Sequence, residues 1–365
     1  MKNPFISVSD NDNSEYVTSR CSLNRAVLAK LPLYGMDDAI EGLMFKDIFS
    51  TPLVVAEIRR IARRYSLDIS DIPDSRLPFI LDEGLSSSGD MRCRQLAQQV
   101  VKKFGTRLGL ILLTLRMGEE ENRLARPDWD DACWEYWRQL DTIILTGGLA
   151  SSMLGRRFKE YILNTFDIAG VKPYNVMLFE NGSYLGVMGV AQRLMEDNSA
   201  ALVLDMGHTG WKRALVRKAT GEITGFTPME SMPSPCMEND LSDEGGRLRL
   251  AGELHRRIVN FIASSYRELS QSAELSDSVL ISIANYTHGG YLDEIHGGYS
   301  KLRLLGSNYA RVLEEELSSE LHREIRVRLV HDGTATALYF SDVDNSACVT
   351  LGTGFGIGFP EIQIV

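Results

Sequence analysis

Residues 201–216 read ALVLDMGHTGWKRALV, and this stretch decides the fold prediction. Two β-rich runs flank a short turn, which predicts a hairpin with Asp205 at the end of its first strand. Gly207 lets backbone N–H groups approach a phosphate oxygen, and the Thr209 hydroxyl adds a donor, so Gly207, His208 and Thr209 are assigned to phosphate binding. Asp205 is a hard oxygen ligand suited to Mg²⁺, directly or through water. The motif by itself is equally compatible with a plain hairpin that carries a solvated aspartate.

A second glycine-rich turn lies in residues 346–359, SACVTLGTGFGIGF. It contains the GxGxxG spacing of a dinucleotide-binding fingerprint, but that fingerprint requires a following helix and a later acidic residue. Here Pro360 follows the glycines, so a strand–turn–strand hairpin fits better. The N–H groups of Gly352, Thr353 and Gly354 would then face an anion. A purely structural glycine turn is the alternative.

Two further strand ends carry candidate chemistry. IRVRLVHD, residues 325–332, predicts a strand that delivers Asp332 to the start of a helix. Asp332 is either a helix N-cap or a carboxylate at the sheet edge where α/β ligands bind, and the two roles are compatible. At that edge it would accept a hydroxyl proton. TIILTGG, residues 142–148, predicts a buried strand whose Gly147 and Gly148 leave bare backbone for a flat ring.

Strands and helices alternate along most of the chain, which predicts an α/β fold. A length of 365 residues is too great for one ordinary core and predicts two domains. Residues 1–20 are expected to be loosely ordered, 23–65 helical, and 68–90 a polar connection. Residues 119–141 hold three of the four tryptophans and are expected to form a helical insertion. The other expected helices are 94–117, 153–166, 186–195, 244–270, 308–322 and 334–341, and the other expected strands are 175–180 and 278–285.

Composition excludes several classes of function. The 49 acidic and 39 basic residues give a formal charge of −10, which argues against a nucleic-acid or anionic-membrane partner. The five cysteines show no zinc-ligand spacing and suit free thiols in a reducing compartment. The N-terminus lacks an apolar signal core and the longest apolar run, 108–115, is too short to span a bilayer, so a cytoplasmic protein is expected. No P-loop, HExxH or GxSxG motif occurs. His288 and His296 are expected in a polar loop rather than a metal site.

Taken together, these pieces resemble the actin-like ATPase superfamily of sugar kinases, most closely its ROK family, with some similarity to hexokinase. The first hairpin looks like the family's first phosphate motif, VHDGTATAL like its catalytic motif, and VTLGTGFGIGF like its second phosphate motif. TIILTGG looks like the adenosine motif, and NVMLFENGSYLGVMGVAQRLM like the closing strand and helix.

The order of these pieces departs from the family. The adenosine-like segment and closing helix, about 94–196, precede the phosphate and catalytic pieces, about 200–359. This is a cyclic shift, so the resemblance implies a circularly permuted chain. It implies a two-lobed actin-like, ribonuclease H-like fold in which 1–196 resembles the family's C-terminal domain and 197–365 its N-terminal domain.

The resemblance also implies an activity: ATP- and Mg²⁺-dependent phosphorylation of a sugar or sugar-like hydroxyl, with ATP in a cleft between the lobes. Asp332 would take the acceptor's proton, and Asp205 would hold Mg²⁺ or its waters. The adenosine would lie beside the two glycines of TIILTGG, and the two hairpins would grip the phosphates. From their position alone, acceptor contacts are assigned to Asn285, Tyr286, His288, Asn308 and His331.

Two departures leave alternatives open. His331 stands where the family has an asparagine that helps hold sugar hydroxyls, and the family's zinc-and-sugar segment has no counterpart, so no zinc site is recognised. A non-catalytic sugar or nucleotide sensor of the same fold is therefore one alternative. Others are an ATPase that docks a protein partner through 119–141, and an unrelated α/β protein with coincidental glycine turns. The expected partner is a small-molecule acceptor, and a homodimer is left open.

Overall fold

The computed structural model describes residues 2–9, 14–86, 90–179, 182–197, 199–235, 243–293 and 298–362. The chain is mixed α/β and divides into two compact units. Unit 1 comprises Met1–Pro4, Arg20–Ser183 and Asn345–Ile357, and unit 2 comprises Phe5–Ser19, Tyr184–Asp344 and Gly358–Val365. This division differs from the linear halves 1–196 and 197–365. The hairpin at 346–358 pairs with unit 1's sheet, and the helix at 185–194 packs in unit 2.

Unit 2 is built on one mixed sheet. Its strands are β5 (Ser199–Met206), β6 (Gly210–Ala219), β7 (Glu222–Pro228), β8 (Met232–Pro233, paired with β6), β9 (Ser278–Ile283) and β12 (Arg326–His331). The spatial order is β12-β9-β5-β6-β7. The parallel strands β12, β9 and β5 are continued on one side by the antiparallel strands β6 and β7. Because the first three are parallel, their carboxyl ends meet at one edge of the sheet.

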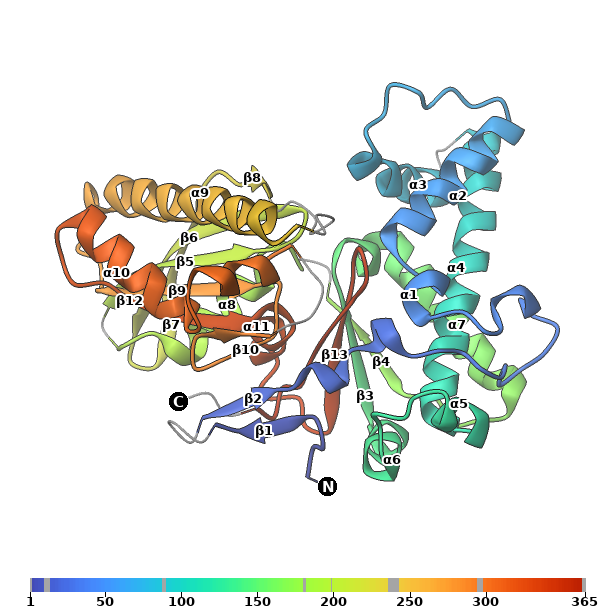
Figure 1. Cartoon of the computed structure of the whole chain (residues 1–365). Helices are drawn as coiled ribbons and strands as arrows, with labels where there is room; N and C mark the ends of the chain where they lie inside the picture. The colour runs from blue at the N-terminus through green and yellow to red at the C-terminus, as the bar shows by residue number, and fades with distance from the viewer. Residues whose placement is uncertain are drawn as a thin grey trace. The chain divides into compact units, whose positions relative to one another are not determined.

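Helices cover both faces of this sheet. Leu202 and Leu204 of β5 face the long helix α9 (Glu244–Ser270) and α10 (Tyr309–Leu321) in one buried cluster. Ala201 and Val203 face α8 (Leu185–Leu194) and α11 (Asp332–Leu338) in another. In Figure 1 the gold helix α9 runs along this sheet. Alternating side chains of one strand therefore serve two cores, as expected for a sheet covered on both sides.

The helix that carries Asp332 is clamped by glycines. A Cβ on Gly189 of α8 would overlap the carbonyl oxygen of Ala335 in α11, and one on Gly358 would overlap that of Gly333. Only residues without a side chain permit this approach. The close packing fixes α11 against the sheet edge and so limits the movement of its first residue.

Unit 1 holds a second sheet and a set of helices. Its strands are β3 (Thr142–Thr146), β4 (Asn175–Leu178), β13 (Ser346–Leu351) and β14 (Phe355–Gly358); its helices are α1 (Phe45–Ile48), α2 (Thr51–Arg64), α3 (Leu77–Leu85), α4 (Met91–Met117), α5 (Glu120–Leu124), α6 (Asp131–Gln139) and α7 (Ser152–Ala169). The spatial order of the strands is β14-β13-β3-β4, of which β13, β3 and β4 are parallel. Gly105 and Gly109 let α4 approach α7, because a Cβ would lie 2.7 Å from Tyr161 Cβ and 2.5 Å from Thr165 Oγ1 respectively.

The two sheets repeat one arrangement. In unit 2 a hairpin, β5–β6, is followed in the chain by two parallel strands that extend the sheet beyond β5. In unit 1 the hairpin β13–β14 has the parallel strands β3 and β4 beyond β13 in the same spatial order. The difference is that unit 1's hairpin comes after its other strands in the chain.

The structure confirms most expected elements and corrects three. Residues 23–44 contain no α-helix, only the short 3-10 turns Leu23–Arg25 and Asp38–Ile40 and a β-bridge between Val27 and Met44. Of the helix expected over 23–65, α1 and α2 are therefore the helical part. Helix α3 lies inside the expected polar connection 68–90. The start of the chain is not loose where it is described, because β1 (Ile6–Val8) pairs with β2 (Glu15–Val17). Glu180, the end of one expected strand, and His296 lie outside the described residues.

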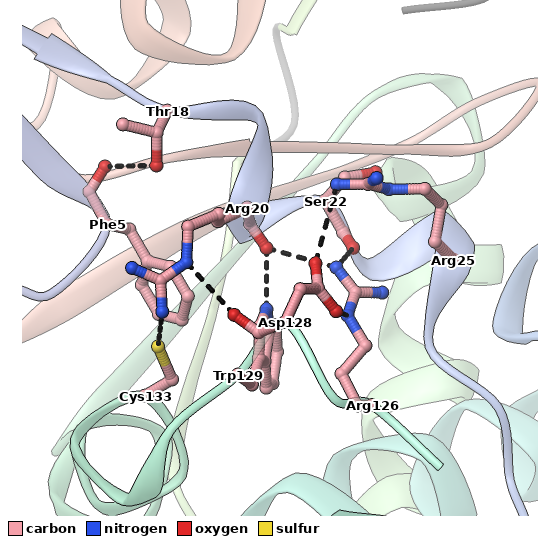
Figure 2. Close-up of polar contacts among 9 residues, drawn as sticks. All are labelled: Phe5, Thr18, Arg20, Ser22, Arg25, Arg126, Asp128, Trp129 and Cys133. Atoms are coloured by element: carbon pink, nitrogen blue, oxygen red, sulfur yellow. Dashed lines mark hydrogen bonds and ion pairs between the residues drawn. The ribbon is translucent and has the colours of Figure 1, made fainter.

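The β1–β2 hairpin is held by packing from distant residues. Phe5 is buried and its ring stacks on Phe359 at 5.6 Å, and Thr18 Oγ1 donates to the Phe5 carbonyl at 3.1 Å (Figure 2). Tyr16 stacks on His288 of the small hairpin β10 (Thr287–His288) and β11 (Tyr291–Leu292) at 4.7 Å. The local polar composition did not reveal this hairpin because its stabilising partners lie far along the chain.

The tryptophan-bearing insertion is packed into unit 1. Trp129, Trp134 and Trp137 are all buried, so they do not form an exposed docking surface. Figure 2 shows Trp129 Nε1 donating to the Arg20 carbonyl at 2.6 Å, while Arg126 Nη2 donates to the same carbonyl at 3.0 Å. These contacts tie the segment that starts at Arg20 to the insertion.

No helix among the described residues combines the length and apolarity needed to cross a membrane.

Candidate active site

The first hairpin presents an exposed turn on a rigid support. Tyr299 Oη donates to the Gly207 carbonyl at 3.0 Å, and Trp211 Nε1 donates to Tyr299 Oη at 2.7 Å. Tyr299 and Trp211 are fully buried, whereas His208 and Thr209 at the tip are exposed. The turn is therefore held from beneath by a buried hydrogen-bond chain, with its tip open to solvent.

Asp205 lies where three strands bring polar side chains together. It pairs with Lys212 across the antiparallel β5–β6 ladder and with Ser282 across the parallel β5–β9 ladder. Ser282 Oγ donates to Asp205 Oδ1 at 2.9 Å, and Lys212 Nζ lies 3.3 Å from Oδ2. The Asp205 side chain is only 15% exposed. Gly186 of α8 approaches closely, since a Cβ there would lie 3.1 Å from Oδ1.

This chemistry suits one hard cation held with few protein ligands. The described residues contain no group of three or more His, Cys, Asp or Glu side chains that could hold a metal ion. Mg²⁺ commonly takes one or two carboxylates and fills its remaining positions with water and substrate phosphates. Asp205 could supply one such carboxylate: Ser282 Oγ donates to its Oδ1, and Lys212 Nζ lies 3.3 Å from its Oδ2.

Asp332 is the first residue of α11 and not its N-cap. The cap is His331, whose Nδ1 accepts the Thr334 N–H at 3.3 Å, so the N-cap interpretation of Asp332 is wrong. Gly333 N donates to Asp332 Oδ1 at 2.7 Å. Burial, and secondly the negative charge of Asp205, raise the pKa of Asp332 to about 7. The side chain remains 38% exposed, so its pKa is raised while a ligand can still reach the carboxylate.

The five residues assigned to acceptor contacts fall into three sets. Asn285 Oδ1 accepts the Asp293 N–H at 3.1 Å, and Asn308 caps α10 by accepting the Arg311 N–H at 3.2 Å, so both amides build loops. His288 is stacked between Tyr16 and Tyr291. Tyr286 and His331 stack on each other next to Asp332.

The glycines of unit 1 separate into those that the fold needs and those that it does not. Gly147 has φ +91°, and a Cβ there would lie 2.5 Å from the Leu351 carbonyl oxygen. A Cβ added at Gly354 would lie 2.7 Å from Asn24 Oδ1. By contrast, Gly148 has nothing within 4 Å of its Cβ position, and Gly352 meets only the Gly354 carbonyl oxygen at 3.7 Å. Neither adopts a positive φ.

The second turn is fixed by a residue from far along the chain. Asn24 Oδ1 accepts the Phe355 N–H at 2.8 Å, and Asn24 Nδ2 donates to the Phe355 carbonyl at 2.9 Å. Thr51 N donates to the Gly352 carbonyl at 2.8 Å, and Thr353 is exposed at the tip. The loop is thus anchored at both ends.

Sequence reasoning missed Asn24, Lys212 and Ser282. Asn24 has no local motif, and no pattern could have found it. Ser282 carried a usable signal, because it is a polar residue inside the buried run SVLISI. Lys212 could have been found by counting the antiparallel register back from the turn to Asp205.

Comparison with known proteins assigns no family. No family model matches the sequence, and no curated protein matches it. The solved structures that are similar in part include the ethanolamine utilization protein EutJ from Carboxydothermus hydrogenoformans, with 17% identity and a TM-score of 0.26. The match covers 54% of this chain and 63% of EutJ, so it spans less than two thirds of that protein. At this TM-score the likeness supports no conclusion about function.

Proposed function

We propose that the chain is a permuted protein of the actin-like ATPase fold that uses Mg²⁺ and ATP to phosphorylate a sugar or sugar-like hydroxyl. The observation that carries this proposal is the meeting of Asp205, Ser282 and Lys212 on neighbouring strands. The same sheet edge also bears Asp332, whose ionisation the Asp205 charge opposes. Two carboxylates with different hydrogen-bond partners suit phosphoryl transfer, in which one would serve the metal and one the acceptor.

The strand order supports the fold part of the proposal. In each unit the hairpin's first strand has its hairpin partner on one side and two successive parallel strands on the other, in one spatial order. In unit 1 the hairpin follows those strands in the chain instead of preceding them. A cyclic shift of an ancestral chain accounts for both facts without any change in the spatial arrangement.

In this mechanism the bond from the γ-phosphorus to its bridging oxygen breaks, and a bond to the acceptor oxygen forms. The acceptor's hydroxyl proton passes to Asp332, whose Oδ2 accepts no hydrogen bond from another described residue. Bound Mg²⁺ would be held by Asp205 and would neutralise phosphate charge. Lys212 adds a positive charge at the same place, and alignment supplies most of the rate.

The phosphates and the adenosine would take backbone contacts. In unit 2 the turn Gly207–Thr209 would offer N–H groups to phosphate oxygens. In unit 1 the turn Gly352–Gly354 would do the same for an anion, and Gly147 and Gly148 would leave bare backbone for a flat ring. Gly148 and Gly352 are glycines that the fold does not require. Close approach of a ligand to the backbone gives a reason for their presence.

The test is release of ADP from Mg·ATP with a panel of hexoses, amino sugars and polyols, combined with ³¹P NMR of the products. A sugar-dependent phosphorylated product supports the kinase. Release of ADP with only inorganic phosphate identifies an ATPase. Calorimetric ATP binding without turnover identifies a sensor, and absence of ATP binding overturns the proposed fold relationship.

Alanine substitutions distinguish glycines that have room for a Cβ from a glycine that does not. Gly352→Ala and Gly148→Ala should leave Tm within about 1 °C, because a Cβ meets no overlap. Each should weaken ATP binding several-fold by blocking close approach to the backbone. The matched control is Gly354→Ala, which should lower Tm because of the Asn24 overlap. Unchanged ATP affinity in both Gly352→Ala and Gly148→Ala would contradict the backbone contacts.

A further inference from the structure

His331 is enclosed beside Asp332 and is too buried to serve as a direct acceptor contact. Its residue exposure is 5%, and its ring stacks on Tyr286 with centroids 4.1 Å apart and planes inclined by 18°. Nδ1 lies 3.3 Å from the Thr334 nitrogen and 3.1 Å from Thr334 Oγ1. The opposite nitrogen, Nε2, lies 3.2 Å from Asp332 Oδ1.

These contacts determine where the ring carries its proton. A backbone N–H can only donate, so Nδ1 must present its lone pair to Thr334. Burial lowers the pKa of His331 to about 3, so the ring is neutral at physiological pH. The single ring proton therefore sits on Nε2, the nitrogen that lies 3.2 Å from Asp332 Oδ1.

The contacts of Asp332 are asymmetric. The Gly333 N–H donates to Oδ1, and His331 Nε2 lies 3.2 Å from the same oxygen, whereas Oδ2 accepts no hydrogen bond from another described residue. The charged groups that bear on this carboxylate are Asp205, which opposes its ionisation, and Lys212, which pairs with Asp205. Tyr286 contributes the ring stacked on His331.

We propose that His331 is a positioning residue: its neutral ring, fixed by Thr334 and Tyr286, presents the Nε2 proton to Asp332 Oδ1 and leaves Oδ2 to receive the acceptor's proton. The catalytic consequence rests on the proposed phosphoryl transfer, whereas the positioning itself does not. The residue thus acts through Asp332 and not on the acceptor.

A simple capping role predicts a different outcome from positioning, and His331→Asn distinguishes them. Asparagine is a good N-cap, so capping survives while the Nε2 proton and the stack are lost. Positioning predicts that kcat falls about 10-fold with KM for ATP unchanged. It also predicts that the midpoint of the kcat–pH profile rises, because a donor to the charged carboxylate is gone.

The matched control is His255→Asn. His255 lies on α9, on the other face of the same sheet, and contacts Tyr309 through Nδ1 at 3.2 Å. This variant also removes a histidine–tyrosine contact in unit 2, but it leaves Asp332 untouched. It should lower Tm without moving the pH profile.

NMR tests the positioning without any assay of activity. The full chain has six histidines, so its nitrogen-15 spectrum contains the ring signals of six residues. The signals that disappear in His331→Asn are those of His331. The expected result is an uncharged Nε2–H ring from pH 5 to 8, together with a carboxyl-carbon midpoint for Asp332 that rises in His331→Asn and not in His255→Asn. A charged ring, an Nδ1–H ring, or an unchanged Asp332 midpoint overturns the positioning role. If the wild-type chain transfers no phosphoryl group, the proposed function fails while these spectra still decide the role of His331.

Discussion

Asp332→Asn should lower kcat by about 10²–10⁴-fold, the range expected when a general base is removed. The amide keeps the size of the carboxylate, so this variant leaves α11 and its glycine contacts intact. An amide cannot take a proton from the acceptor. ATP binding should be retained or slightly strengthened, because a negative charge beside the phosphates is removed. Single-turnover kinetics and calorimetry with Mg·ATP measure the two effects separately.

The control for this substitution is Asp342→Asn, at an exposed carboxylate later in the same unit. It should leave kcat within a factor of two. Near-normal turnover of Asp332→Asn would refute the assignment of Asp332 as the base, whatever its effect on stability.

The same variant should be more thermally stable than the wild type at neutral and alkaline pH. The folded-state pKa of Asp332 is raised from 3.8 to about 7, so ionisation of this carboxyl favours the unfolded chain. The wild type loses stability as pH rises from about 4 to about 7, and the loss is complete above that range. The gain in Tm for Asp332→Asn should therefore be absent near pH 4, grow toward pH 7 and stay constant at pH 8. A lower Tm at pH 8 would contradict the raised pKa.

Asp205→Asn should remove most of the benefit that Mg²⁺ brings to ATP binding. Loss of a metal ligand or its support typically costs about 10–100-fold in affinity. Calorimetry with ATP, with and without Mg²⁺, should show this loss only when the metal is present. The midpoint of the kcat–pH profile should also fall, because the Asp205 charge is the second cause of the raised pKa of Asp332.

Ser282→Ala is the control for Asp205→Asn and makes a smaller change to the same carboxylate. It removes only the 2.9 Å hydrogen bond to Oδ1 and leaves the charge in place. Loss of one such bond corresponds to about 1 kcal/mol, or roughly a five-fold weaker Mg²⁺ effect. An Asp205→Asn variant that keeps the full effect of Mg²⁺ would exclude Asp205 as its ligand.

The local parts of the site were predictable from the sequence, and the parts that depend on distant pairing were not. The hairpin around Asp205 and the strand that ends before Asp332 follow from alternation and turn residues within short windows. Lys212 and Ser282 join Asp205 only through strand register, and Asn24 reaches the second turn from 331 residues away. Asn308 and Asn285 were assigned acceptor contacts from their position alone, and their Oδ1 atoms each accept a backbone N–H that the sequence did not reveal.

The place of β13 in the chain has a consequence for synthesis on the ribosome. Strand β3 is buried along its whole length and lies between β4 and β13, yet β13 is made only after residues 184–344 of unit 2. While those residues are being translated, one hydrogen-bonding edge of β3 has no strand to pair with, and an unpaired strand edge makes an incompletely folded chain prone to aggregate. Unit 1 therefore cannot complete its sheet cotranslationally ahead of unit 2, although most of its residues emerge first.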